Sequence, residues 1–106
     1  MGRVFTQDQI GLLAAVDNTH VQLPPSIVTV GGQQYVTSNL ILNAASNGFN
    51  GLDTGSLANT TLYYVYGVVV SGVFGIVASS NPVLPVGFTY TSRRLGWFTT
   101  NGSAHI

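Results

Sequence analysis

Residues 62–78 limit the fold of this chain more than any other segment. They form two runs of β-branched and aromatic residues separated by Ser71-Gly72, a pattern typical of a β-hairpin. A half-exposed strand has a polar residue at every second position, but here both alternating faces are apolar. Such a ribbon aggregates when exposed, so both faces need cover. We expect the domain core to cover one face and a neighbouring subunit to cover the other. The first face carries Tyr63, Val65 and Val69, and the second carries Tyr64, Tyr66, Val68 and Val70.

Charged residues are nearly missing from this apolar chain. The 106 residues include no Lys, Glu or Cys, and 6% are charged while 45% are hydrophobic. An ordinary soluble domain has about 25% charged residues, which keep it soluble and unassociated. The composition therefore predicts that much apolar surface lies against other protein, as in a homo-oligomer. The charged residues are Arg3, Asp8, Asp17, Asp53, Arg93 and Arg94.

Turn signals at short intervals predict an all-β chain. Gly31-Gly32 separates two strand-like runs and predicts a hairpin with a two-residue turn. The architecture we expect is an antiparallel β-sandwich or jelly-roll-like domain. The predicted strands are 27–30, 33–37, 40–42, 62–70, 73–79, 88–90 and 95–100; 43–60 and 81–87 are predicted loops, and 92–94 and 101–102 predicted turns.

Residues 6–16 predict a short N-terminal helix. Thr6 and Gln9 have the spacing of a capping box, and Asp8 lies where the helix dipole favours an anion, although Gly11 weakens the helix. Pro24-Pro25 then enforces an extended segment. We therefore divide the chain into a helix and docking arm at residues 1–26 and a β-sandwich domain at residues 27–106.

The second half resembles the small structural proteins of tailed-bacteriophage virions, among them head or tail fibres and capsid decoration proteins. The resemblance covers about residues 50–106. It implies a β-rich, often trimeric virion protein without an enzymatic centre. Its segments are Gly51-Leu52-Asp53-Thr54-Gly55-Ser56-Leu57, Thr61-Leu62-Tyr63-Tyr64-Val65-Tyr66, Gly87-Phe88-Thr89-Tyr90, Arg93-Arg94-Leu95-Gly96-Trp97 and Thr100-Asn101-Gly102-Ser103.

Catalytic and cofactor-binding signals are weak. The chain has no Cys nucleophile and no Gly-x-Ser-x-Gly elbow, and two His residues, His20 and His105, fall short of the usual three or four metal ligands. We predict no enzyme activity, no catalytic residue, no metal and no cofactor. The chain also lacks a basic patch for nucleic acid and an apolar run long enough for a transmembrane helix. Neither nucleic acid nor a membrane is an expected partner.

Interface residues are predicted from the arm and the two-sided ribbon. A structural ion pair is predicted between Asp53 and Arg93 or Arg94; in the alternative, the arginines are solvated or meet a neighbouring subunit. Trp97 is expected in the core or an interface because large aromatic residues dominate both. Ile10 and Leu13 are the predicted docking residues, and Tyr64, Tyr66, Val68 and Phe74 the predicted subunit-packing residues.

These observations predict a non-enzymatic structural protein of a phage virion. It would serve as capsid decoration or cement, as a head-fibre base or as a connector, and would act by oligomerisation and docking. The expected partners are further copies of the chain, with a trimer preferred, and capsid or tail proteins. The alternative is a receptor- or carbohydrate-binding tail-fibre module, because the five Tyr, the Trp and many Asn and Gln could contact host surface glycans.

Overall fold

A computed structural model describes residues 10–83, 85 and 92–106. This part of the chain is all-β, as predicted, and contains no helix. Its strands are β1 (Ala14–Ala15), β2 (His20–Leu23), β3 (Ser26–Val30), β4 (Gln33–Thr37), β5 (Leu40–Asn47), β6 (Gly51–Leu52), β7 (Leu62–Val70), β8 (Val73–Ser79) and β9 (Ser92–Thr99).

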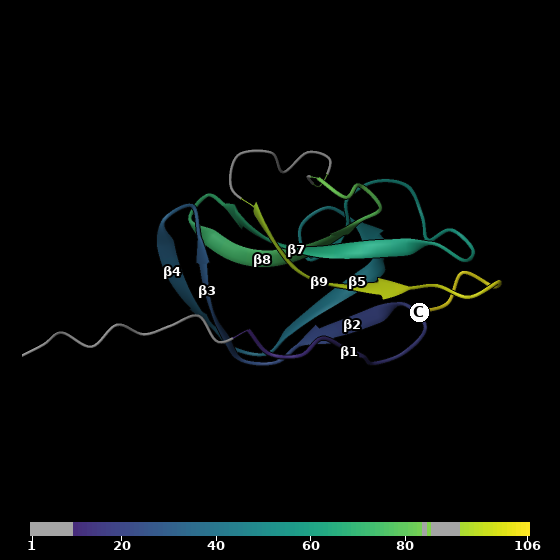
Figure 1. Cartoon of the computed structure of the whole chain (residues 1–106), viewed down its shortest axis with the longest axis horizontal. Coiled ribbons are helices and arrows are strands. Elements are labelled where there is room, and N and C mark those ends of the chain that lie inside the picture. Colours follow the sequence, from purple (N-terminus) through teal and green to yellow (C-terminus); the bar gives the residue numbers. More distant parts are fainter. Residues whose placement is uncertain (1–9, 84, 86–91) are drawn as a thin grey trace, which may run out of the picture.

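Seven of the strands form one sheet in the order β1-β2-β5-β6-β8-β7-β9, and β3 and β4 form a separate two-stranded sheet. The large sheet curls, and the β3–β4 pair lies at one end of it (Figure 1). The short strand β6 is parallel to both of its neighbours, β5 and β8, whereas the other pairs are antiparallel. Among the described strands, β1 and β9 are therefore the two edges of the large sheet.

The two predicted hairpins are confirmed. β3 pairs with β4 across Gly31-Gly32, and β7 pairs with β8 across Ser71-Gly72. Both residues of each turn have positive φ, at 60° and 81° in the first turn and 50° and 79° in the second. Positive φ at both central residues is the geometry of a type I′ turn, which matches the twist of antiparallel strands. Local turn geometry therefore fixes both hairpins.

The predicted N-terminal helix is wrong over residues 10–16, and its first part lies outside the described residues. Ala14 and Ala15 form β1, which pairs with β2. The N–H of Gly11 donates a 2.9 Å hydrogen bond to Ser26 Oγ, and Ile10 and Leu13 pack against the main core. The extended path places both apolar side chains on the core, and this packing overrides the weak helix propensity of the segment.

The arm predicted at residues 1–26 is not separate from the body over residues 14–23. β2 is hydrogen-bonded to β5 in the large sheet, and Val21 and Leu23 are buried in the core. Two further local predictions differ from the structure. β5 continues to Asn47 and β6 follows, where 43–60 was predicted as loop, and residues 92–94 begin β9 instead of forming a turn. The strand predicted at 88–90 lies outside the described residues.

The main core lies inside the curl of the large sheet, between β2 and β5 on one side and β7, β8 and β9 on the other. Its apolar side chains come from strands far apart in the sequence, so the core joins the N-terminal and C-terminal parts of the chain. The buried members are Val21, Leu23, Leu42, Ala44, Leu52, Tyr63, Val65, Ile76, Ala78 and Phe98.

A second, smaller core covers the opposite face of β7. Tyr66, Val68 and Val77 are at most 2% exposed there, and Tyr64 packs against them. The chain that follows β8 supplies part of the cover, because the Tyr66 hydroxyl donates a 2.5 Å hydrogen bond to the Asn81 carbonyl. The ribbon is therefore covered on both faces as expected, but at Tyr66 and Val68 the chain itself supplies the cover that we expected from a neighbouring subunit.

Candidate functional site

Exposed apolar side chains border open hollows at several places on the described surface, and three of these places are the larger ones. Isolated exposed apolar residues are normal on a protein surface, but adjacent ones mark contact sites. One such place lies at the end of the molecule formed by two hairpins, one along the seam between the two sheet edges, and one on the outer face of β7 and β9.

The first surface, called the hairpin end, consists of Tyr35, Val36, Val73 and Phe74. The side chains of Val36 and Val73 are 80% and 58% exposed. Tyr35 and Phe74 stack with their ring centroids 5.6 Å apart, which joins β4 to β8. These four residues border an open hollow of about 350 Å³. The hairpin end is thus a continuous apolar surface supported by a rigid aromatic pair.

The strand β4 borders the hairpin end. Among the described residues β4 pairs with β3 alone, and Figure 1 shows β4 as the outermost strand at that end. Edge strands normally carry charges, proline or a bulge that prevents pairing with another chain. No Lys, Arg, Asp or Glu occurs between Asp17 and Asp53, so β4 has no charge of its own. Its residues Gln33 and Gln34 are exposed but uncharged.

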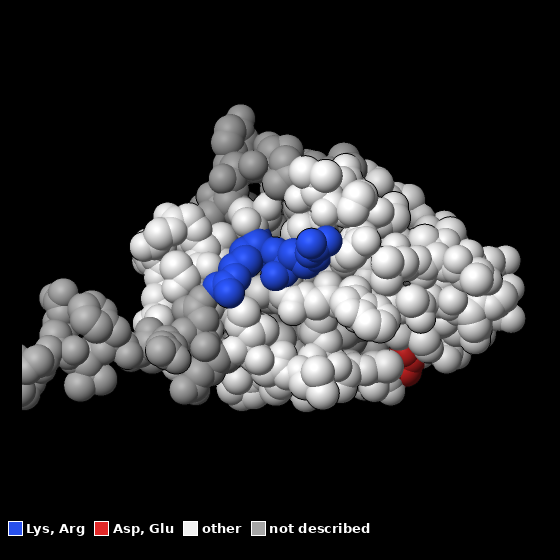
Figure 2. All heavy atoms as spheres, viewed as in Figure 1, with Lys and Arg blue, Asp and Glu red and all other residues white. Residues whose placement is uncertain are grey.

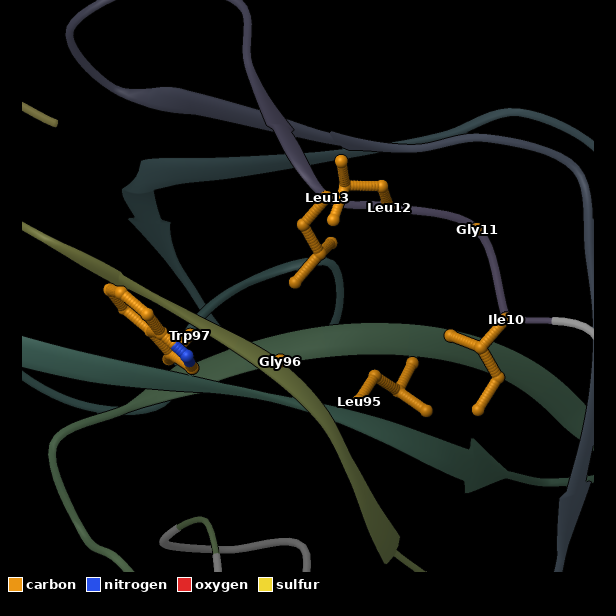
Figure 3. A pocket seen from close by; sticks show the side chains of 7 residues that line it. All are labelled: Ile10, Gly11, Leu12, Leu13, Leu95, Gly96 and Trp97. Atoms are coloured by element: carbon orange, nitrogen blue, oxygen red, sulfur yellow. The ribbon is translucent and has the colours of Figure 1, made fainter.

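The second surface, called the seam groove, lies between residues 10–13 and residues 95–97 (Figure 3). It is an open groove of about 560 Å³ where the two edges of the curled sheet approach one another. Ile10, Leu13 and Leu95 contribute to the main core from the groove walls. Leu12 remains 88% exposed. At this groove the main core is therefore not fully covered by the described residues.

The third surface, called the arginine hollow, is formed by Tyr64, Arg94 and Trp97, with Leu95 and Gly96 between them, and encloses about 440 Å³. Arg94 and Trp97 are three positions apart, so a regular strand would place them on opposite faces. A register shift in β9 pairs Arg94 with Tyr66 and Trp97 with Tyr64. Cross-strand partners share a face, so the bulge brings all three side chains to the outer face.

The guanidinium of Arg94 is held against this hollow. It lies 4.8 Å from the centroid of the Tyr64 ring, and its Nη1 donates a 3.3 Å hydrogen bond to the Pro82 carbonyl. A cation over a tyrosine face at this distance is attracted by the ring quadrupole. The Trp97 side chain is 64% exposed beside it. Figure 2 shows the arginines of β9 as a basic band, with an acidic area well apart from it.

The predicted interface residues divide into two groups. Tyr66 and Val68 are buried in the chain's own interior and present no surface to a neighbour, which corrects their assignment to subunit packing. Ile10 and Leu13 border the seam groove, Tyr64 borders the arginine hollow and Phe74 belongs to the hairpin end. Sequence reasoning missed Val36 and Val73, although the hairpin prediction with its turn at Ser71-Gly72 already placed Val73 at an exposed tip.

The predicted ion pair stays a prediction, but the surroundings of its members are clear. Asp53 Oδ1 accepts a 2.7 Å hydrogen bond from the N–H of Thr54, the local turn contact expected of a loop aspartate. Arg93 Nη1 donates a 3.2 Å hydrogen bond to the Thr29 carbonyl, which ties β9 to β3. Arg93 therefore helps to hold the two-stranded sheet against the large one, while Arg94 lines the arginine hollow.

The side chains of Asp17 and His20 contact one another in the turn before β2. The N–H groups of Thr19 and His20 each donate a 2.9 Å hydrogen bond to Asp17 Oδ1, and His20 Nδ1 lies 2.7 Å from the same oxygen. The hydrogen bond from the Thr19 N–H, followed by that from the His20 side chain, lowers the pKa of Asp17 below its ordinary value of 3.8. Each stabilises the ionised carboxylate.

We predict that the variant Asp17→Asn loses a pH-dependent part of the folding stability. Because the folded-state pKa of Asp17 is lowered, its contribution is complete above the unfolded pKa and disappears as the pH falls through the folded value. The wild type should therefore exceed Asp17→Asn in unfolding free energy at about pH 7 by more than at about pH 3. Denaturant unfolding at both pH values measures this; an equal difference at the two would contradict it.

Residues 10–83, 85 and 92–106 contain no group of three His, Cys, Asp or Glu side chains that could hold a metal ion. The same residues contain no helix that is long and apolar enough to cross a membrane. The described surfaces offer apolar area at the hairpin end and seam groove, and aromatic and cationic contacts at the arginine hollow.

Comparison with known proteins identifies the family of the chain. Residues 11–104 match a family model described as "Mtd second domain". The match includes β1 to β9 and all residues of the three surfaces except Ile10 of the seam groove. No curated protein and no solved structure matches the chain.

Proposed function

The chain belongs to the Mtd second domain family, and we propose that it is a non-enzymatic structural module of a phage virion that acts by self-association. It would work without a cofactor and contact protein instead of nucleic acid or membrane. The observation that carries this proposal is the hairpin end, where the side chains of Val36 and Val73 are 80% and 58% exposed on a charge-free part of the chain.

A second copy of the chain is the occupant that best fits the hairpin end. The formal net charge of zero gives copies no long-range repulsion. The strand β4, which pairs with β3 alone among the described strands, could add a strand from another copy, and the neighbouring apolar side chains offer surface to bury. Pairing of β4 with a strand of another copy would form main-chain hydrogen bonds between the subunits and would also cover the Val36 side chain. We propose a homo-oligomer, with a trimer preferred because the resembling virion proteins are often trimeric.

The virion role rests on the resemblance of residues 50–106 to tailed-phage structural proteins. Within that role we propose capsid decoration or cement, a head-fibre base or a connector, with capsid or tail proteins as further partners. The family description supports a modular role because its wording refers to a second domain. We also propose that the fold is a β-sandwich or jelly-roll variant, a reading supported by β2 and β5 packing opposite β7 to β9 across the main core.

Sedimentation of the full chain and of a charged variant tests the self-association. The wild type should sediment as a multiple of the 11.1 kDa chain mass. The variant Val36→Lys/Val73→Lys should sediment at the single-chain mass with its fold intact, because two lysines cannot be buried unpaired at an apolar contact. Val83→Lys is the matched control: Val83 is 73% exposed but lies outside the hairpin end, so the oligomer should persist.

Two outcomes would contradict the proposal. A wild-type chain that remains a single folded molecule at high concentration would remove self-association altogether. An oligomer that persists in Val36→Lys/Val73→Lys would place the contact elsewhere on the molecule, and the hairpin end would lose its assigned role.

A further inference from the structure

We propose that the arginine hollow binds a sugar ring that carries a carboxylate, such as a uronic acid residue of an acidic glycan. This site is distinct from the hairpin end. Tyr64 borders the hollow, and Val70 pairs with Val73 of the hairpin end. These two residues lie six positions apart on β7, so the two surfaces are about 20 Å apart along the strand. The inference does not depend on self-association and follows from three features of the hollow.

The first feature is the exposed ring of Trp97, which lies beside the Tyr64 ring that the Arg94 guanidinium covers. Trp97 lies opposite Tyr64 in the β7–β9 register. The Trp97 side chain is 64% exposed, although a residue of this size is ordinarily well buried. An indole ring combines a flat apolar face with an N–H donor at the rim. This combination suits a pyranose, whose C–H groups form an apolar face and whose hydroxyl groups surround it.

The second feature is the position of the Arg94 guanidinium. Its contacts with the Tyr64 ring and the Pro82 carbonyl hold it at the border of the hollow. A guanidinium carries five N–H donors, and the bond to Pro82 uses one of its nitrogens, Nη1. Guanidinium and carboxylate groups form paired hydrogen bonds with matching geometry. The side chain is therefore placed to select a carboxylate on a sugar that stacks beside it.

The third feature is the size and charge of the site. The hollow of about 440 Å³ is within the range of small-molecule sites and is open to solvent, so it fits one or two sugar rings. The Arg94 guanidinium gives the hollow a positive charge, so the local field favours an anion. An open site with one charged contact predicts weak binding, with a Kd of about 1 mM for a monosaccharide.

The fluorescence of Trp97 provides a direct test because the chain contains a single Trp. Glucuronic acid is titrated into the full-length chain, with glucose and sodium acetate as the comparison ligands at equal ionic strength. We expect a saturable change in Trp emission with glucuronic acid, and binding at least about tenfold weaker for glucose and for acetate, since each lacks one of the two contacts. Equal binding of acetate would show an adventitious anion site and overturn the proposal, as would equal binding of glucose or no saturable change.

Two arginine variants separate the specific contact from general attraction. Arg94→Gln should weaken glucuronic acid binding by at least about tenfold. Arg93→Gln removes the same charge one residue away, and its binding should stay within about threefold of wild type. Equal loss in both variants would overturn the assigned role of Arg94. Thermal unfolding shows whether each variant is folded, and Arg94→Lys, which keeps the charge but not the paired geometry, provides an intermediate affinity.

The same titration on Val36→Lys/Val73→Lys keeps the two proposals distinguishable. That variant lacks the proposed oligomer contact but retains Tyr64, Arg94 and Trp97. Sugar binding by the variant supports the arginine hollow whatever the sedimentation results show. Loss of sugar binding in a folded variant would overturn the claim that the hollow acts independently of the hairpin end.

Discussion

Replacing Tyr66 by alanine is expected to lower the free energy of unfolding by about 3–5 kcal/mol, the cost of deleting a large buried aromatic side chain. Tyr66 is 2% exposed, packs with Val68 and Val77, and is hydrogen-bonded to Asn81. A domain of this size has a total stability of about 5–15 kcal/mol, so the variant should be marginally folded. Denaturant unfolding with linear extrapolation measures the change.

Tyr66→Phe is the matched control, because it keeps the ring and removes the hydroxyl that donates to the Asn81 carbonyl. We expect a loss of about 1 kcal/mol, the usual net value of a single hydrogen bond. Both variants are compared in the Val36→Lys/Val73→Lys background, so that association does not add to the measured stability. An alanine variant no less stable than the phenylalanine variant would mean that the chain does not itself cover the outer face of β7.

The second large effect is expected at Leu23. Leu23→Ala should lower the free energy of unfolding by about 2–5 kcal/mol, because the side chain is fully buried and its removal leaves a cavity. Leu23 is 0% exposed and belongs to the main core together with side chains from β5, β7 and β8. The prediction tests the finding that β2 is part of the body. The same unfolding experiment measures it.

Leu12→Ala makes the same chemical change eleven positions earlier. The Leu12 side chain is 88% exposed, so its removal should alter the stability by no more than about 0.5 kcal/mol. If the two variants have equal stabilities, residues 10–26 do not contribute to the core and the arm predicted from the sequence regains support. A large difference confirms that the N-terminal segment is built into the sheet.

The hairpins could be predicted because residues close together in the sequence determine them. Gly31-Gly32 and Ser71-Gly72 specify turns with positive φ, and the flanking residues are β-branched or aromatic. The bounds predicted for β7 and β8 agree with the structure. The two-sided apolar pattern of residues 62–78 also indicated correctly that both faces of this ribbon need cover.

The remaining fold depends on contacts between distant residues. β6 is two residues long and pairs in parallel with β5 and β8, so no alternation within the sequence reveals it. The path of residues 10–16 is decided by the core that Ile10 and Leu13 contact, not by their helix propensity. The source of the outer cover of β7 is equally non-local, because Asn81 lies fifteen residues beyond Tyr66.

The arginine hollow shows why the sites were harder to predict than the strands. The sequence marked Arg94 and Trp97 separately, one as an ion-pair candidate and one as a packing residue. Strict alternation would keep them on opposite faces of β9, and the register shift between Val65 and Tyr66 of β7 places them together. A bulge leaves no distinct mark in the sequence, so the juxtaposition becomes visible in the structure alone.

The brevity of β6 has a mechanical consequence. Among the described strands, the group β1-β2-β5 is hydrogen-bonded to the group β8-β7-β9 through β6, which meets β8 at the single register pair Leu52–Ala78. A tensile load that draws the two groups apart would concentrate on these few bonds and on the apolar contacts behind them. Under such a load the sheet should therefore separate first at β6, while β7 and β8 remain hydrogen-bonded to each other.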